Sequence, residues 1–116
     1  MSRADPLRLA NYLRHIPDAI DNIRTYTTGM DLAAFKADRK TQDAVIRNLD
    51  VIGEACHNIA KNHSVFASSH ASVPWGFAFE MRNALLHGYF TVDLAIVWQT
   101  VQNDLPGLRV QIASLP

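Results

Sequence analysis

A seam of apolar residues at helical spacing constrains the fold of this chain more than any other feature. The seam lies within residues 41–62 and has intervals of four, three, four and three residues: Val45, Leu49, Ile52, Cys56 and Ile59. This spacing indicates one long α-helix with a coiled-coil-like apolar stripe. The polar residues of the segment fall largely outside the stripe: Arg47, Asp50, Glu54, Asn58 and Lys61. Gly53 costs such a helix about 1 kcal/mol relative to Ala, so we expect another helix to approach closely there.

The N-terminal segment carries clear start and stop signals for a helix. Asp5 is placed to be the N-cap, Pro6 suits the first helical position, and Gly29 suits a left-handed C-cap. Pro17 interrupts the apolar pattern, so a kink or break is predicted just before it.

The rest of the chain also has helical patterns. A short helix is expected over residues 30–38 with Asp31 as its cap, and a loop over the Ser-rich residues 63–72. A third helix is predicted from Pro74 and Trp75 towards Gly88. The last is expected to start at Thr91 or Asp93 and to bend at Pro106 and Gly107.

These patterns predict one all-α domain over residues 1–116, an antiparallel bundle of four to five helices. The 116 residues suffice for a single modest core, and no strand alternation or repeat interrupts the helical spacing.

Charge and apolar content narrow the class of protein. Lys+Arg and Asp+Glu both number 11, so a polyanion would need a local basic patch, for which the N-terminal arginines are candidates: Arg3, Arg8, Arg14 and Arg24. A solvated helix face is the simpler explanation of that set. Because no signal peptide or membrane span is apparent and Cys56 is the single cysteine, we expect a cytoplasmic protein with no membrane contact.

The stretch "EMRNALLHGYF", residues 80–90, sets four polar residues in an apolar run: Arg82, Asn83, His87 and Tyr89. Polar groups in such a run need partners or a function. Residues five apart on a helix diverge by about 140°, so Arg82 and His87 need local unwinding near Gly88 or a symmetric dimer to meet. An internal hydrogen-bond network is the simpler alternative.

The chemistry open to this set is RNA cleavage without a metal. Arg82 can bind phosphate oxygens and stabilise charge developing on phosphorus. His87 can move a proton near neutral pH. Asn83 could orient either partner, and the hydroxyl of Tyr89 could hold a phosphate or be modified itself.

The motif and its surroundings resemble the HepT proteins, minimal members of the HEPN superfamily. "RNALLHGY" fits the R-x4-H-x-Y pattern of that family, and "IGEA", "PW", "HGYF" and "NDLPGL" follow in the family's order along nearly the whole chain.

The resemblance implies a dimer, or a higher oligomer, with a composite ribonuclease site made by two motifs. It implies that Arg82 and His87 are catalytic, with Asn83 assisting, in the toxin of a bacterial toxin–antitoxin pair. The partner would be a minimal nucleotidyltransferase (MntA-like) that attaches AMP to Tyr89, and the substrate an RNA such as tRNA.

Other candidate residues have weaker patterns. Cys56 and His57 diverge by about 100° on a helix, which does not suit a nucleophile and its base. His57, His63 and His70 lack the spacing of a zinc site, so neither metal nor cofactor is predicted. Glu54 could hold the guanidinium of Arg82, and a surface or helix-capping role is an equal alternative. The indole rings of Trp75 and Trp98 are expected to be core anchors rather than platforms for bases.

Three functional hypotheses follow from the sequence. The first is a ribonuclease toxin, and the second is a non-catalytic HEPN module that binds nucleotide, RNA or its partner. The third is a structural helical dimer in which the motif is an internal network. Loss of RNA cleavage in an Arg82 or His87 variant that still dimerises would separate the first hypothesis from the others.

Overall fold

The computed structural model describes residues 5–76, 80–81 and 93–116, and these residues contain helices and no strand. The elements follow one another as α1 (Pro6–Tyr26), α2 (Leu32–Ala37), α3 (Arg39–Asn62), α4 (Ser64–Ser69), α6 (Leu94–Gln99), a π-helical turn η1 (Thr100–Asp104) and α7 (Leu105–Ala113). Trp75, Gly76, Glu80 and Met81 are also helical. The prediction of an all-α fold is confirmed.

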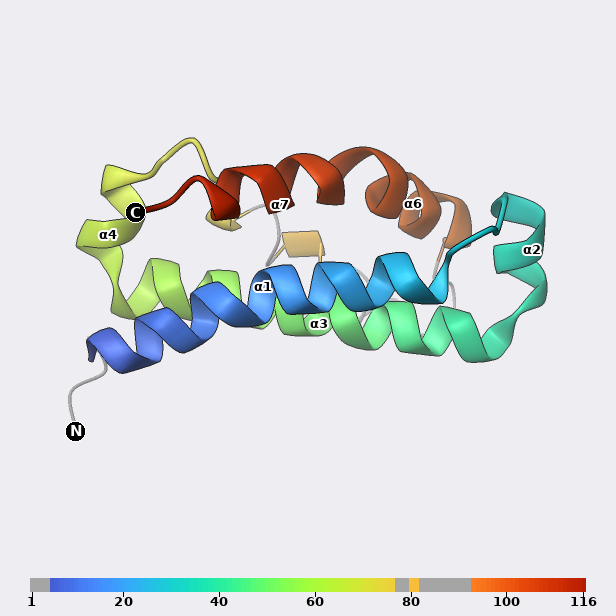
Figure 1. Cartoon of the computed structure of the whole chain (residues 1–116), viewed down its shortest axis with the longest axis horizontal. Coiled ribbons are helices and arrows are strands. Elements are labelled where there is room, and N and C mark those ends of the chain that lie inside the picture. Colours follow the sequence, from blue (N-terminus) through green and yellow to red (C-terminus); the bar gives the residue numbers. More distant parts are fainter. Residues whose placement is uncertain (1–4, 77–79, 82–92) are drawn as a thin grey trace.

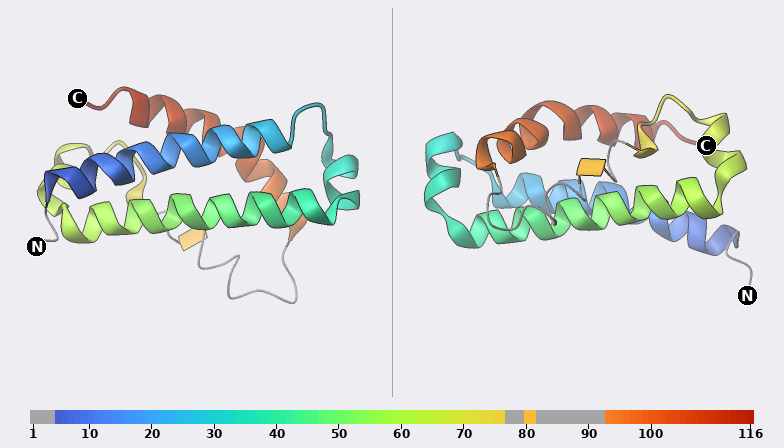
Figure 2. Two further views of the ribbon diagram at one scale, coloured as in Figure 1. Left: turned by 60° about the horizontal axis from the view of Figure 1, so that its bottom comes forward. Right: turned by 180° about the vertical axis from the view of Figure 1, so that it is seen from behind.

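The long helices α1 and α3 lie side by side and run antiparallel (Figure 1). The continuous run of α6, η1 and α7 packs on α1 through α7. It runs parallel to α3 and antiparallel to α1, as the two further views show (Figure 2). The short helices α2 and α4 lie at opposite ends of the molecule (Figure 1). The result is an antiparallel helical bundle.

The apolar seam of α3 forms the centre of the core, as predicted. All five seam residues are between 0% and 4% exposed. Opposite them lie apolar residues from α1 and from the C-terminal helical run: Ile16, Ile20, Ile23, Val97, Val101, Leu105, Leu108 and Ile112. Gly53 is buried within the same helix.

Helix α1 starts as predicted but does not break at Pro17. The Asp5 carboxylate accepts a hydrogen bond of 2.8 Å from the backbone N–H of Leu7. Pro17 lies inside the helix and cannot donate to the carbonyl of Leu13. Because Ile16 and Ile20 on either side of Pro17 are fully buried, core packing outweighs the lost hydrogen bond, and the helix continues without the break that was one of the two predicted outcomes. Gly29 has the predicted left-handed conformation, with φ of +76°, but it lies two residues beyond the C-cap of the helix, which is Thr27.

The prediction of a loop over residues 63–72 was wrong, since Ser64–Ser69 form α4. The Ser69 hydroxyl donates to the carbonyl of Val65 at 2.9 Å, within the helix. Ala67 is 8% exposed, and its carbonyl also accepts a hydrogen bond from the Trp75 indole. Tertiary packing thus stabilises a short helix whose Ser-rich composition predicts a loop.

The C-terminal helical run begins at one of the two predicted positions. Asp93 is the N-cap of α6, and its carboxylate accepts from the N–H groups of Ala95 and Ile96 at 3.0 and 3.2 Å. The helix continues through Pro106 and Gly107, and the change in winding lies just before them, in η1. Pro106 cannot donate to the carbonyl of Gln102, so a wider turn at this point accommodates the missing hydrogen bond.

Candidate functional site

The four motif residues Arg82, Asn83, His87 and Tyr89 lie outside the described residues. Their roles therefore stay predictions from the sequence. The structure defines the two ends from which their segment extends, at Met81 and at Asp93.

Trp75 anchors the end that leads into the motif. Its indole N–H donates to the carbonyls of Ala67 and His70, both at 3.3 Å, and the residue is 6% exposed. The centroid of the Phe66 ring lies 4.6 Å from that of the His70 ring and 6.5 Å from that of the Trp75 ring. Trp75 is therefore a core anchor, as predicted, and it fixes where the helical residues before the motif begin.

A second contact holds the same region from the C-terminal helix. The Gln111 side-chain amide donates to the carbonyl of Ser72 at 2.8 Å, across 39 residues of sequence. Residues this far apart carry no spacing signal, so the sequence could not indicate Gln111.

The end that follows the motif is fixed by α6. Asp93 caps this helix, and the Trp98 ring packs on Phe35 of α2 with centroids 5.3 Å apart. Trp98 is half-buried beside the core, which agrees with the prediction that it is an anchor. Both ends of the motif segment therefore join well-packed parts of the bundle.

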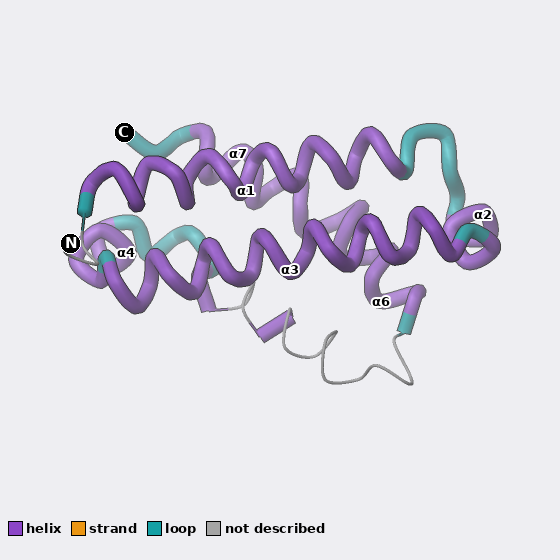
Figure 3. The backbone as a smooth tube through the Cα atoms, turned by 90° about the horizontal axis from the view of Figure 1, so that it is seen from below, coloured by secondary structure: helices purple, strands orange, loops and turns teal. Residues whose placement is uncertain are grey.

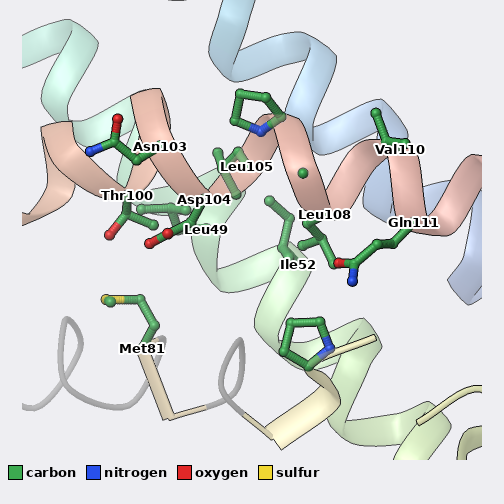
Figure 4. Close-up of a pocket in the computed structure, with 13 residues that line it drawn as sticks. Leu49, Ile52, Met81, Thr100, Asn103, Asp104, Leu105, Leu108, Val110 and Gln111 are labelled. Carbon is green, nitrogen blue, oxygen red and sulfur yellow. The ribbon is translucent and has the colours of Figure 1, made fainter. Parts of the chain in front are cut away.

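A groove of about 670 Å³ adjoins Met81. Leu49 and Ile52 of α3 face it from one side, and Leu105 and Leu108 of α7 face it from the other (Figure 4). Thr100, Asn103 and Asp104 add polar groups at one end of the groove, and Gln111 adds another at the far end (Figure 4). The Thr100 hydroxyl already donates a hydrogen bond of 3.0 Å to the carbonyl of Ile96. Among the described lining residues only Asp104 can titrate, so they do not supply the acid and base that phosphodiester cleavage needs.

The alternative pair of Cys56 and His57 does not form a nucleophile and its base. The Cys56 thiol is fully buried in the α3 seam, and burial raises its pKa to about 12. A thiol that stays protonated in an apolar core is not nucleophilic.

The other histidines form no metal site with their described neighbours. His63 is 7% exposed and contacts the Tyr12 ring edge-on, with centroids 6.2 Å apart. Within residues 5–76, 80–81 and 93–116, no group of three or more His, Cys, Asp or Glu side chains is arranged to hold a metal ion.

The N-terminal arginines do not form one basic face. Arg8, Arg14 and Arg24 are all exposed on α1, and Arg3 lies outside the described residues. Around the helix axis, Arg14 lies about 120° from Arg8 and about 80° from Arg24. Arg14 also donates to the Asn11 side chain at 3.2 Å. A solvated helix surface explains these residues better than a nucleic-acid patch.

Glu54 lies on the exposed side of α3, as the seam predicted. It lines a small pocket of about 200 Å³ between α1 and α3, together with Tyr12, His15 and Asn58. Its predicted contact with Arg82 lies outside the described residues.

No described helix is both long enough and apolar enough to cross a membrane.

Comparison with known proteins identifies the family. The profile of the family described as "Ribonuclease HepT-like" matches residues 16–115. A protein of Thermococcus cleftensis named "Probable ribonuclease HepT" is 40% identical over 105 residues, which are 90% of this chain and 93% of the relative. A protein of Caldanaerobacter subterraneus named as a "Putative RNase" is 33% identical over 104 residues, 90% of each chain.

A third relative matches over less than half of its own length. It is a Methanocaldococcus jannaschii protein named "Gamma-glutamylcyclotransferase and putative RNase", 36% identical over 104 residues. The match covers 90% of this chain but 46% of that relative. No solved structure matches significantly. The family profile and the relatives agree on one conclusion: this chain belongs to the HepT-like ribonuclease family of the HEPN superfamily.

Proposed function

We propose that this protein is a metal-independent endoribonuclease and the toxin of a type VII-like toxin–antitoxin pair. The observation that carries the proposal is the sequence "RNALLHGY" at residues 82–89, an R-x4-H-x-Y motif in a chain of a ribonuclease family. Arg82 and His87 are the proposed catalytic residues, with Asn83 assisting.

The proposed reaction is an internal transfer at phosphorus. The ribose 2′-oxygen attacks the adjacent phosphorus as its proton is removed, and the bond from phosphorus to the 5′-oxygen breaks as that oxygen gains a proton. The products are a 2′,3′-cyclic phosphate and a free 5′-hydroxyl. The His87 imidazole would carry one of these protons, and the Arg82 guanidinium would stabilise the extra negative charge on the phosphoryl oxygens.

A homodimer would complete this site. A continuous helix separates Arg82 and His87 by about 140°, so residues from two facing motifs would be needed around one phosphate. A cleft between two chains would also explain why polar residues are tolerated in an apolar run.

Tyr89 is the proposed control point. A partner nucleotidyltransferase of the MntA type would join the phosphorus of AMP to the Tyr89 hydroxyl oxygen and release pyrophosphate from ATP. Each AMP adds bulk and a negative phosphodiester two residues from His87, which would repel an RNA phosphate from the same cleft.

The first test is cleavage of total RNA and purified tRNA in the presence of EDTA by a dimer verified by light scattering. We expect cyclic-phosphate ends from the unmodified protein, and a rate loss of at least about 100-fold in His87→Ala and in Arg82→Ala. His15→Ala, which removes an exposed histidine of α1, is the matched control and should cleave normally.

A wild-type dimer that binds RNA but never cuts it would contradict the enzymatic proposal and favour a non-catalytic binding module. Normal cleavage by His87→Ala would exclude His87 as a catalytic residue.

The second test is intact-mass spectrometry of the protein expressed with and without a nucleotidyltransferase encoded beside it. We expect mass gains in AMP-sized steps that map to Tyr89 and vanish in Tyr89→Phe. Modification at another residue, or full activity of the modified protein, would refute the proposed control.

A further inference from the structure

Three cations gather where α2 meets α3: Lys36, Arg39 and Lys40, here called the basic corner. All three are exposed. Within the described part of the chain, none of their side chains takes part in an ion pair or donates a hydrogen bond. Lys40 affects Asp38 in two minor ways, through its backbone N–H and through its charge, and both lower the pKa of the Asp38 carboxyl.

The backbone beneath the basic corner is firmly held. The Gln42 side-chain amide donates to the carbonyls of Phe35 and Lys36 at 2.8 and 3.0 Å. Asp38 accepts from the N–H of Thr41 at 3.0 Å, and Phe35 is fully buried. The three cations therefore extend from a fixed platform.

Three carboxylates at this end of the molecule serve as helix caps, and one of them, Asp38, lies directly before Arg39. Asp31, Asp38 and Asp93 each cap a helix by accepting backbone N–H groups. Asp43 is exposed one turn into α3, but no ion pair joins it to the basic corner. The cations thus remain available to an external anion.

Helix stability does not account for two of the three cations. Arg39 and Lys40 are the first two residues of the 24-residue α3, whose first turn contains no acidic residue. Cations at a helix N-terminus oppose the helix dipole, whereas Asp or Glu would be stabilising there. Residues that break this local rule are expected to have another role.

The basic corner lies close to the point where the motif segment rejoins the bundle. Helix α2 packs on α6 through the rings of Phe35 and Trp98. Helix α6 begins directly after Asp93, and residues 82–92 precede it in the chain. Figure 3 shows α2 and the start of α6 at the same end of the molecule.

We propose that the basic corner binds backbone phosphates of the RNA strand that the motif cleaves. This inference rests on the proposed function. Lys36, Arg39 and Lys40 would hold the strand through charge alone, since they have no fixed partner that would orient them towards a base edge.

The test is RNA binding measured as a function of salt. A labelled single-stranded RNA is titrated by fluorescence anisotropy, with His87→Ala in every protein to prevent cleavage. Each phosphate contact contributes about 0.7 to the slope of log affinity against log salt, or about fivefold in affinity between 1 M and 0.1 M salt. Arg39→Gln with Lys40→Gln should therefore lower the slope by about 1.4 and the affinity at 0.1 M about 25-fold.

The matched control removes one Arg and one Lys from the other end of the bundle. Arg8 and Lys61 are also exposed, and along the α3 axis Lys61 lies about 30 Å from Lys40. Arg8→Gln with Lys61→Gln should change the affinity less than about twofold.

A charge reversal separates lost binding from lost folding. Arg39→Glu with Lys40→Glu should bind RNA still more weakly but melt at a higher temperature, because acidic residues suit the start of α3.

Equal losses in the basic-corner and control pairs, or no loss in either, would overturn the inference. So would unchanged RNA affinity with lost binding to the partner nucleotidyltransferase, which would make the basic corner a protein-binding surface. If the otherwise wild-type protein does not cleave RNA but Arg39→Gln with Lys40→Gln still weakens binding as stated, the proposed function fails and the basic corner stands. If the otherwise wild-type protein cleaves RNA and the double variant Arg39→Gln with Lys40→Gln binds RNA normally, the proposed function stands and the inference about the basic corner fails.

Discussion

At the scale of single residues, His63 is a polar side chain that is buried with one ring nitrogen unpartnered in the described part of the chain. It lies between α3 and α4, is 7% exposed, and its Nε2 atom has no hydrogen-bond partner among the described residues. A buried nitrogen without a partner loses its hydrogen bonds to water and gains none in the protein, which lowers the free energy of unfolding. We expect His63→Phe, which keeps an aromatic edge against Tyr12, to raise the free energy of unfolding by up to about 1 kcal/mol in urea titrations.

His63→Ala is the comparison, because it removes the ring as well as the nitrogen. It should lower the free energy of unfolding by about 2 kcal/mol through the cavity that it leaves. If His63→Phe is as damaging as His63→Ala, Nε2 is hydrogen-bonded in solution and the interpretation fails.

Cys56 shows what sequence reasoning can decide at this scale. Its place in a regular apolar seam predicted a core residue, and the fully buried thiol confirms that prediction. His63 was not predicted to be buried, because its burial depends on how α4 folds back, and spacing in the sequence does not contain that information.

At the scale of elements, Asp93 controls how the chain enters α6 directly after the motif segment. Its carboxylate accepts two backbone hydrogen bonds that the first turn of the helix would otherwise lack. Asp93→Ala should lower the free energy of unfolding by about 1 kcal/mol, measured in urea. Asp93→Asn keeps an acceptor oxygen and should cost much less. Equal losses in the two variants would mean that the charge of Asp93, and not its hydrogen bonds, stabilises α6.

Helix starts were predictable and irregular helices were not. Asp5, Asp31 and Asp93 cap helices where the sequence placed them, because a cap depends on neighbours two or three residues away. Helix α4 and the unbroken passage of α1 through Pro17 depend on burial against other helices. The π-helical turn before Pro106 has a local cause, the hydrogen bond that Pro106 cannot donate, but the sequence placed the bend at Pro106 and Gly107 rather than in the turn before them.

At the scale of the whole molecule, the sequence predicted the helical bundle, which the structure confirms, and a chemistry for the motif, which stays a prediction. It did not predict the contacts that hold the two ends of the motif segment. The supporting contacts join distant residues, such as Gln111 with Ser72 and Phe35 with Trp98. No local pattern encodes pairs of this kind. The basic corner was missed for another reason: its three cations lie within five residues of sequence, but only the structure shows that they are exposed and form no ion pair with a described residue.

One ion pair joins the N-terminal helix α1 to the C-terminal helix α7 across 88 residues of sequence. Arg109 of α7 donates two hydrogen bonds, of 2.7 and 2.9 Å, to the Asp21 carboxylate of α1. These hydrogen bonds, with the charge of Arg109, lower the pKa of the Asp21 carboxyl from its usual value. Because the folded-state pKa lies below the unfolded one, the unfolded chain binds the proton more readily. The pair therefore stabilises the fold above about pH 4, and its contribution is lost as the pH falls through the folded-state pKa.

Asp21→Asn should accordingly have a lower free energy of unfolding than the wild type at pH 7. This gap in the free energy of unfolding should narrow as the pH falls below about 4. About 1 M salt at pH 7 should also narrow the gap, since both side chains are partly exposed and salt screens their charges. Chemical denaturation with urea at a series of pH values measures both effects. Asp43→Asn removes an exposed α3 carboxylate that forms no ion pair with a described residue, and should show no such gap. A gap for Asp21→Asn that is the same at every pH would mean that Asp21 stabilises the contact of α1 with α7 by its shape rather than by its charge.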